Sequence, residues 1–162
     1  MTSHPLPLTG GCQCGAIRYA IHGEPTNPLI CHCRMCQKAF GAIAVAFFSA
    51  RQADIEWTRG QPALYCSSAA AERGFCRECG TPLTFQATGS EDVDFALGSL
   101  DRPADVKPQK QHWVDARMPW FHELPDLPVV VSSASTEEIA RRRPYQHPDH
   151  DTAQWPDAGS PS

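Results

Sequence analysis

The chain has 162 residues, of which 41% are apolar, and this length and composition are enough for one domain with a modest core. Its formal charge of -4, with lysine and arginine scattered along the sequence, argues against a surface that binds nucleic acid or an anionic membrane. No apolar run approaches the roughly 20 residues of a membrane span, and residues 1–10 lack the basic start and apolar stretch of an export signal.

Short β-prone segments with partial alternation recur along the chain, separated by turn residues. They lie at 16–22, 43–49, 53–57, 63–67, 83–87 and 93–97. This rhythm is typical of a mainly antiparallel β domain. In the first segment Ile17, Tyr19 and Ile21 share one face, which we expect to meet the core, while Arg18 and Ala20 share the other face.

Helices are expected to be few and short, because fifteen prolines and eleven glycines interrupt the sequence. A turn of helix fits 33–40, and a capping box at 135–138 ahead of three arginines predicts a second short helix. After residue 143 the composition is rich in Pro, Asp, His and Ser, which favours a mobile tail. The predicted organisation is a flexible N-terminus at 1–8, one folded domain at 9–132, and a short helix with a disordered tail at 133–162.

Seven of the eight cysteines fall into three tight groups with the spacing of metal ligands. The groups are Cys12 and Cys14; Cys31, Cys33 and Cys36; and Cys76 and Cys79. Disulfides are the alternative, since the total is even, but neighbours at i and i+2 are poorly placed for an unstrained bond. With no export signal, we expect a cytoplasmic protein whose cysteines bind zinc.

The natural partition of these ligands gives two zinc ions of different kinds. Cys12, Cys14, Cys76 and Cys79 would form a closed structural site that ties the first strand to a later loop. Cys31, Cys33 and Cys36 would hold a second ion with its fourth position open to water or substrate, as in catalytic sites.

Other assignments of the middle group stay open from the sequence. Cys66 or His32 would complete it as a second structural site, or it would remain without metal. If the local backbone is extended, His32 projects away from the ion and is a surface group or a support for a ligand. Cys66 has no cysteine near it in the sequence, and we expect it to be a buried free thiol.

Three thiolates make zinc a mild Lewis acid toward water, and such a site suits a thiol substrate. A thiol entering the open position would lose its proton near neutral pH and become a positioned nucleophile or leaving group. The donor set therefore favours chemistry at carbon–sulfur bonds over hydrolysis of peptides or phosphates.

Taken together, the motifs resemble the glutathione-dependent formaldehyde-activating enzyme family, also called the CENP-V/GFA domain family. The resemblance covers about residues 9–130. It rests on the sequences around the three cysteine groups, namely Gly11-Cys12-Gln13-Cys14-Gly15, Cys31-His32-Cys33-Arg34-Met35-Cys36 and Phe75-Cys76-Arg77-Glu78-Cys79-Gly80-Thr81-Pro82-Leu83, and on His112-Trp113-Val114 and Met118-Pro119-Trp120.

The resemblance implies a small Mss4-like antiparallel β domain with two zinc ions, divided among the cysteines as above. It also implies a carbon–sulfur lyase that joins glutathione and formaldehyde into S-hydroxymethylglutathione, with a thiol and a small aldehyde as partners. The alternatives are a non-catalytic zinc-stabilised binding module and a repair enzyme similar to methionine sulfoxide reductase, with Cys66 as its nucleophile. The sequence singles out none of the candidate cations for the carboxylates of glutathione, which are Arg34, Lys38, Arg51, Arg73 and Lys110. Trp113 and Trp120 would either wall a pocket near the metal or pack in the core.

Overall fold

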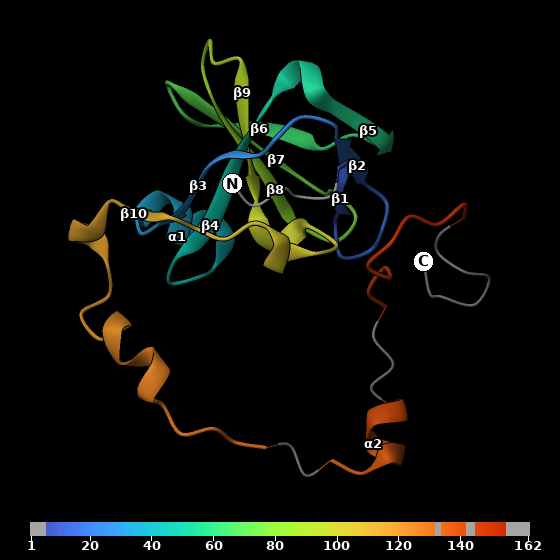
Figure 1. Ribbon diagram of the computed structural model, residues 1–162, viewed down its shortest axis with the longest axis vertical. Coiled ribbons are helices and arrows are strands. Elements are labelled where there is room, and N and C mark those ends of the chain that lie inside the picture. Colours follow the sequence, from blue (N-terminus) through green and yellow to red (C-terminus); the bar gives the residue numbers. More distant parts are fainter. Residues whose placement is uncertain (1–5, 132–133, 142–144, 155–162) are drawn as a thin grey trace.

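Ten strands form two sheets in the computed structural model, which describes residues 6–131, 134–141 and 145–154 (Figure 1). The strands are β1 (Leu8–Gly11), β2 (Arg18–Ile21), β3 (Thr26–Cys31), β4 (Val45–Arg51), β5 (Ile55–Arg59), β6 (Ala63–Ser68), β7 (Ala71–Phe75), β8 (Pro82–Ala87), β9 (Asp92–Ala96) and β10 (Lys110–His112). The helices are α1 (Arg34–Phe40) and α2 (Thr136–Arg141), with short 3-10 turns η1 (Gln52–Asp54), η2 (Leu97–Ser99), η3 (Pro103–Asp105), η4 (Val114–Ala116) and η5 (Phe121–Asp126). The predicted mainly β class is confirmed.

The small sheet has the order β1-β2-β5, and the large sheet has the order β10-β3-β4-β9-β8-β7-β6. Strand pairs are antiparallel throughout these two sheets, except that β10 runs parallel to β3. Because β10 comes late in the sequence, this pairing returns the chain to the edge beside the second cysteine group: His112 lies opposite Cys31.

Each predicted β segment corresponds to an observed strand, and α1 lies where a helical turn was expected. Four strands were not predicted: β1, β3, β7 and β10. Their sequences weaken the usual strand signals, since Pro28 lies within β3, Gly74 within β7, and β1 ends in two glycines. These strands form because neighbouring strands supply hydrogen bonds that local propensity does not predict.

The main core lies between the two sheets and is centred on aromatic residues. Tyr19, Phe48 and Phe95 are fully buried, and the ring centroids of Tyr19 and Phe95 are 4.7 Å apart. The Tyr19 hydroxyl and the Ser99 Oγ share a hydrogen bond of 2.7 Å, which satisfies the polar end of a buried ring. The predicted core face of β2 is therefore confirmed.

The opposite face of β2 is also buried, contrary to the expected alternation. Arg18 is only 3% exposed. Its guanidinium forms ion pairs with Asp101 at 2.5 Å and with Asp151, near the end of the chain, at 2.7 Å. The backbone amide of His147 donates to the carbonyl of Gln13 at 2.7 Å, so residues 145–154 make defined contacts with the small sheet. The boundaries of the three predicted segments stay a prediction.

One face of the large sheet carries a row of paired residues across four strands. Arg73 on β7 lies opposite Phe85 on β8, Phe85 lies opposite Asp94 on β9, and Asp94 lies opposite Ser49 on β4. Paired residues of an antiparallel sheet point to the same side. Ser49 in turn lies opposite Thr26, the first residue of β3. Cys31, the last residue of β3, lies opposite Val45, which is on the same face of β4 as Ser49. Within the described ranges, no helix combines the length and apolar character that crossing a membrane requires.

Candidate metal centres

The first and third cysteine groups come together in space although more than 60 residues separate them. The sulfurs of Cys12, Cys14, Cys76 and Cys79, here called the four-cysteine cluster, all lie within 4.8 Å of one another. Cys14 Sγ is 3.6 Å from Cys12 Sγ and 3.8 Å from Cys76 Sγ. A tetrahedral site with zinc–sulfur bonds of about 2.3 Å has sulfur–sulfur edges of about 3.8 Å. The donor set therefore fits one zinc ion.

Two glycines shape the backbone around the four-cysteine cluster. Gly15 and Gly80 adopt φ values of 74° and 77°, a region that favours glycine. The backbone amide of each glycine donates to the backbone carbonyl of the first cysteine of its pair. The chain can then curl back, and the amide of Ile17 donates to the sulfur of Cys12 at 3.3 Å. The curl next to Gly15 therefore brings a backbone amide to the sulfur of Cys12.

The ionisation of the four-cysteine cluster is uneven in the metal-free protein. Burial raises the pKa of Cys12. Burial also disfavours the Cys79 thiolate, but the hydroxyl and the amide of Thr81 donate to its sulfur and lower its pKa to about 6. The Cys79 thiol therefore ionises more readily than the Cys12 thiol, and a bound cation would favour the thiolate form of the ligands.

The middle group also converges, at the junction of β3 and α1. The sulfurs of Cys31, Cys33 and Cys36, here called the three-cysteine cluster, lie within 4.8 Å of one another. Cys31 ends β3, the sulfur of Cys33 caps α1 by accepting from the Cys36 amide at 3.3 Å, and Cys36 lies in the first turn of α1. Among the residues that the structure describes, no fourth His, Cys, Asp or Glu joins this group. Three soft donors with no fourth protein ligand fit a zinc site that keeps one position for substrate.

A buried arginine faces the three-cysteine cluster from the row on the large sheet. Arg73 is 3% exposed and its Nη2 donates to the sulfur of Cys36 at 3.3 Å. Its guanidinium carbon also lies 4.9 Å from the centre of the Phe85 ring, which is a cation–π distance. Hydrogen bonds from Cys31 and Arg73 lower the pKa of Cys36 to about 5, while the interaction with Cys36, together with burial, raises the pKa of Cys31.

A cavity of about 400 Å³ opens beside the three-cysteine cluster, and we call it the thiol cavity. Its other lining residues include apolar, aromatic and charged side chains: Leu29, Arg34, Met35, Phe47, Arg73, Phe85, Asp94, His112 and Trp113. Trp113 is 68% exposed, so it lines the cavity from the surface, and the alternative of a core position is wrong. Asp94 was not among the predicted site residues. Its position between Val93 and Phe95, which are buried, is the one sequence signal that could have placed it on the other face of the strand.

Two further predictions change. His32 is fully buried rather than a surface group: its Nε2 is 2.9 Å from the Gln111 Oε1, and its ring packs edge-on against Phe121. His32 therefore supports the segment between Cys31 and Cys33, which was the alternative prediction for this residue. Cys66 is exposed on β6 and belongs to neither cluster, so the expected buried thiol is wrong. All eight cysteines are free thiols, which removes the disulfide alternative.

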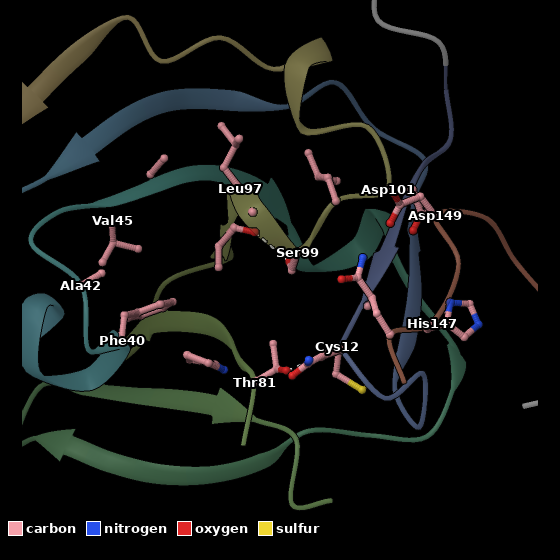
Figure 2. A pocket seen from close by; sticks show the side chains of 18 of the residues that line it. Cys12, Phe40, Ala42, Val45, Thr81, Leu97, Ser99, Asp101, His147 and Asp149 are labelled. Carbon is pink, nitrogen blue, oxygen red and sulfur yellow. Dashed lines mark hydrogen bonds between the residues drawn. The ribbon is translucent and has the colours of Figure 1, made fainter. Parts of the chain in front are cut away.

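A second, larger cavity of about 570 Å³ has Cys12 in its lining. Figure 2 shows that it extends from Phe40 and Val45 to Cys12 and His147. Its walls combine η2 with the loop that contains Cys12 and the segment that contains His147. It therefore borders the four-cysteine cluster, and no cysteine of the three-cysteine cluster lines it.

Residues 7–116 match the family described as glutathione-dependent formaldehyde-activating enzyme, a segment that contains both cysteine clusters. The chain belongs to this family. Among curated proteins, an uncharacterized lyase of Schizosaccharomyces pombe is 31% identical over 86 residues, which cover 53% of this chain and 62% of that relative. A crystal structure of a Rhodobacter sphaeroides protein from a structural genomics programme is similar with a TM-score of 0.52 and 24% identity, over 64% of this chain and 99% of that one. This last similarity concerns the fold alone.

Proposed function

We propose that this chain is a zinc-dependent carbon–sulfur lyase that joins a thiol to a small aldehyde and cleaves the adduct, with glutathione and formaldehyde as the leading pair. The observation that carries the proposal is the three-cysteine cluster beside a cavity with no fourth protein ligand in the described part of the chain. Membership of the formaldehyde-activating family and the similarity to a protein named as a lyase support the same class of reaction.

The two clusters would hold one zinc ion each. The four-cysteine cluster supplies a complete set of soft donors and would serve the fold. The three-cysteine cluster would hold the second ion. When bound there, zinc supplies positive charge that favours the thiolate form of an incoming thiol.

The reaction itself needs one new bond and one proton transfer. The substrate sulfur attacks the aldehyde carbon, the carbon–sulfur bond forms, and the electron pair of the carbonyl bond moves to oxygen. That oxygen then takes up the proton that the thiol gave up, so the adduct is neutral and nothing is oxidised. The reverse reaction breaks the carbon–sulfur bond and returns thiol and aldehyde.

The chain prepares this step by positioning charge and excluding water. Arg73 compensates part of the negative charge of the three-cysteine cluster through its hydrogen bond to Cys36. Leu29, Phe47 and Phe85 give the thiol cavity apolar walls, which reduce the dielectric and strengthen that interaction. The substrate thiol would enter from the side that Trp113 lines.

The test is two-dimensional exchange NMR on protein loaded with two zinc ions per chain. The expected result is faster exchange between free formaldehyde hydrate and its glutathione adduct than in buffer. The variant Cys31→Ser should lose this acceleration, whereas Cys66→Ser, which removes an exposed thiol outside both clusters, should keep it. No acceleration over buffer with the second ion present would overturn the substrate assignment.

The binding-module alternative makes a different prediction about the same cysteines. If both ions were purely structural, replacing Cys36 would lower stability as much as replacing Cys76, and no thiol would reach the metal.

We place the catalytic unit at residues 9–132 and the protein in the cytoplasm, where thiolate ligands remain reduced.

A further inference from the structure

We propose that the thiol cavity contains a subsite for an ammonium group, formed by the carboxylate of Asp94 and the indole of Trp113, so that the preferred substrate is a thiol that also carries a free amine. This inference deepens the proposed function and rests on it for the identity of the reacting group. The ammonium subsite itself depends only on the residues that line the cavity.

The position of Asp94 follows from the pairing of four strands. Asp94 lies between Phe85 and Ser49 in the row of paired residues, on the sheet face that the thiol cavity covers. Arg73 begins the same row and contacts the three-cysteine cluster. Arg73 thus hydrogen-bonds to the Cys36 sulfur, and Asp94 lies two positions along the row, beyond Phe85. Arg34 and His112 line the same cavity.

In the described ranges Asp94 forms no ion pair with a lysine or an arginine, and besides the Ser49 hydrogen bond only His112, which lines the same cavity, favours its charged form. The Asp94 Oδ1 accepts a 2.5 Å hydrogen bond from the Ser49 hydroxyl. Burial raises its pKa above the ordinary value. A half-buried anion that faces an apolar cavity gains most from a cationic hydrogen-bond donor. An ammonium group is the smallest organic cation that meets this need.

Aromatic side chains complete the environment of a cation. Phe85 lies beside Asp94 in the sheet, and Trp113 lines the same cavity with an exposed indole. Trp113 adopts φ 57° and ψ 44°, a left-handed conformation that non-glycine residues rarely take. Such conformations gather at ligand sites, where the surrounding structure holds them. The indole face of Trp113 attracts an ammonium group in addition to the carboxylate, whereas the Phe85 ring already contacts the Arg73 guanidinium.

This composition distinguishes the substrate from simple thiols. An alkyl thiol would fill the apolar walls but leave Asp94 without a partner. A thiol acid would bring a second carboxylate toward Asp94, and like charges in a cavity of low dielectric repel. An aminothiol, or a peptide thiol with a free amino group, places its sulfur at the three-cysteine cluster and its cation at Asp94.

The experiment uses two small thioethers that differ only in the terminal group, which is an ammonium in 2-(methylthio)ethylamine and a neutral hydroxyl in 2-(methylthio)ethanol. Each is titrated into the full-length, zinc-loaded, nitrogen-15-labelled protein at pH 7, and binding is followed on the indole resonance of Trp113, assigned with a Trp113→Phe variant. We expect the amine to bind about tenfold more tightly than the alcohol, the ratio that one charge-assisted hydrogen bond provides. Asp94→Asn, which keeps the size of the side chain, should remove this preference.

Asp92→Asn is the matched control, because Asp92 lies on the same strand, points to the same side and is exposed outside the cavity lining. It should keep the preference for the amine. Equal binding of both probes by the wild-type protein would overturn the proposal without any variant. Loss of the preference in Asp92→Asn to the same extent as in Asp94→Asn would also overturn it. The preference for the amine would then come from the overall negative charge of this region and not from a contact with Asp94. The probes carry no thiol, so the result is independent of whether the exchange reaction is accelerated.

Discussion

Replacing Arg73 with methionine separates the affinity of the second zinc site from the stability of the fold. Arg73 donates to the Cys36 sulfur at 3.3 Å, and both groups are buried. A hydrogen bond to a charged group contributes about 1.5–3 kcal/mol. Its loss should weaken zinc binding at the three-cysteine cluster about 10- to 100-fold, while the four-cysteine cluster keeps its affinity.

The metal-free protein should respond in the opposite sense. Nε and Nη1 of Arg73 are buried without a hydrogen-bond partner in the described residues. Burying a cation with unsatisfied donors costs free energy, and methionine has a similar length with no charge. In zinc-free protein at a pH below 5, where the Cys36 thiol is protonated and no longer pairs with Arg73, Arg73→Met should therefore unfold at the same denaturant concentration as the wild type or at a higher one.

The assay is competition with a chromophoric chelator that resolves the two ions, combined with denaturant unfolding of metal-free protein. Arg77→Met is the control, because Arg77 is an exposed arginine between two ligands of the other cluster. Unchanged affinity of the second ion in Arg73→Met would refute the reasoning, as would an equal loss in Arg77→Met.

Four further predictions concern the sulfurs. In metal-free protein the thiolate absorbance near 240 nm should fall as the pH drops through about 6 and 5, the pKa values of Cys79 and Cys36, and Cys36→Ser should lose the lower step. Because the pKa of Cys36 in the folded state lies below its ordinary value of 9.0, its contribution to stability is complete above pH 9 and disappears as the pH falls through 5, which urea unfolding at several pH values will detect. In zinc-loaded protein Cys76→Ala should lower the free energy of unfolding by more than about 4 kcal/mol, since loss of a structural metal is among the largest single-residue effects; calorimetry showing a smaller change would argue against a structural ion there. Cys66→Ser should keep the full rate of thiol–aldehyde exchange, and a loss of that rate would instead favour a reactive Cys66, as in the repair-enzyme alternative.

Much of the metal chemistry was predictable because metal ligands follow short sequence spacings. Two cysteines one or two residues apart converge wherever the local backbone curls, and Gly15 and Gly80 show how that curl is made. The division into four and three sulfurs is also observed in the structure, and the first helix lies where the second cysteine group predicted it. The binding of zinc to these sulfurs stays a prediction for metal analysis.

The errors have a common cause in strand pairing. Arg18 was placed on an exposed face by alternation, yet Asp101 and Asp151, far along the chain, cover it. Cys66 was expected to be a buried free thiol because no other cysteine lies near it in the sequence, but β6 is the edge of the large sheet and leaves it exposed. Neither outcome depends on local sequence, since each is decided by which segment lies alongside.

The sequence by itself determined the donor atoms, their grouping and the β character of the domain, because these depend on residues within a few positions of one another. Only the tertiary structure decided what faces the three-cysteine cluster. Arg73, Asp94 and Trp113 come from separate strands and loops and meet at one cavity through the order β10-β3-β4-β9-β8-β7. Cross-strand pairing sets such neighbours, and its free energy comes from burial and hydrogen bonds between distant segments rather than from any local pattern.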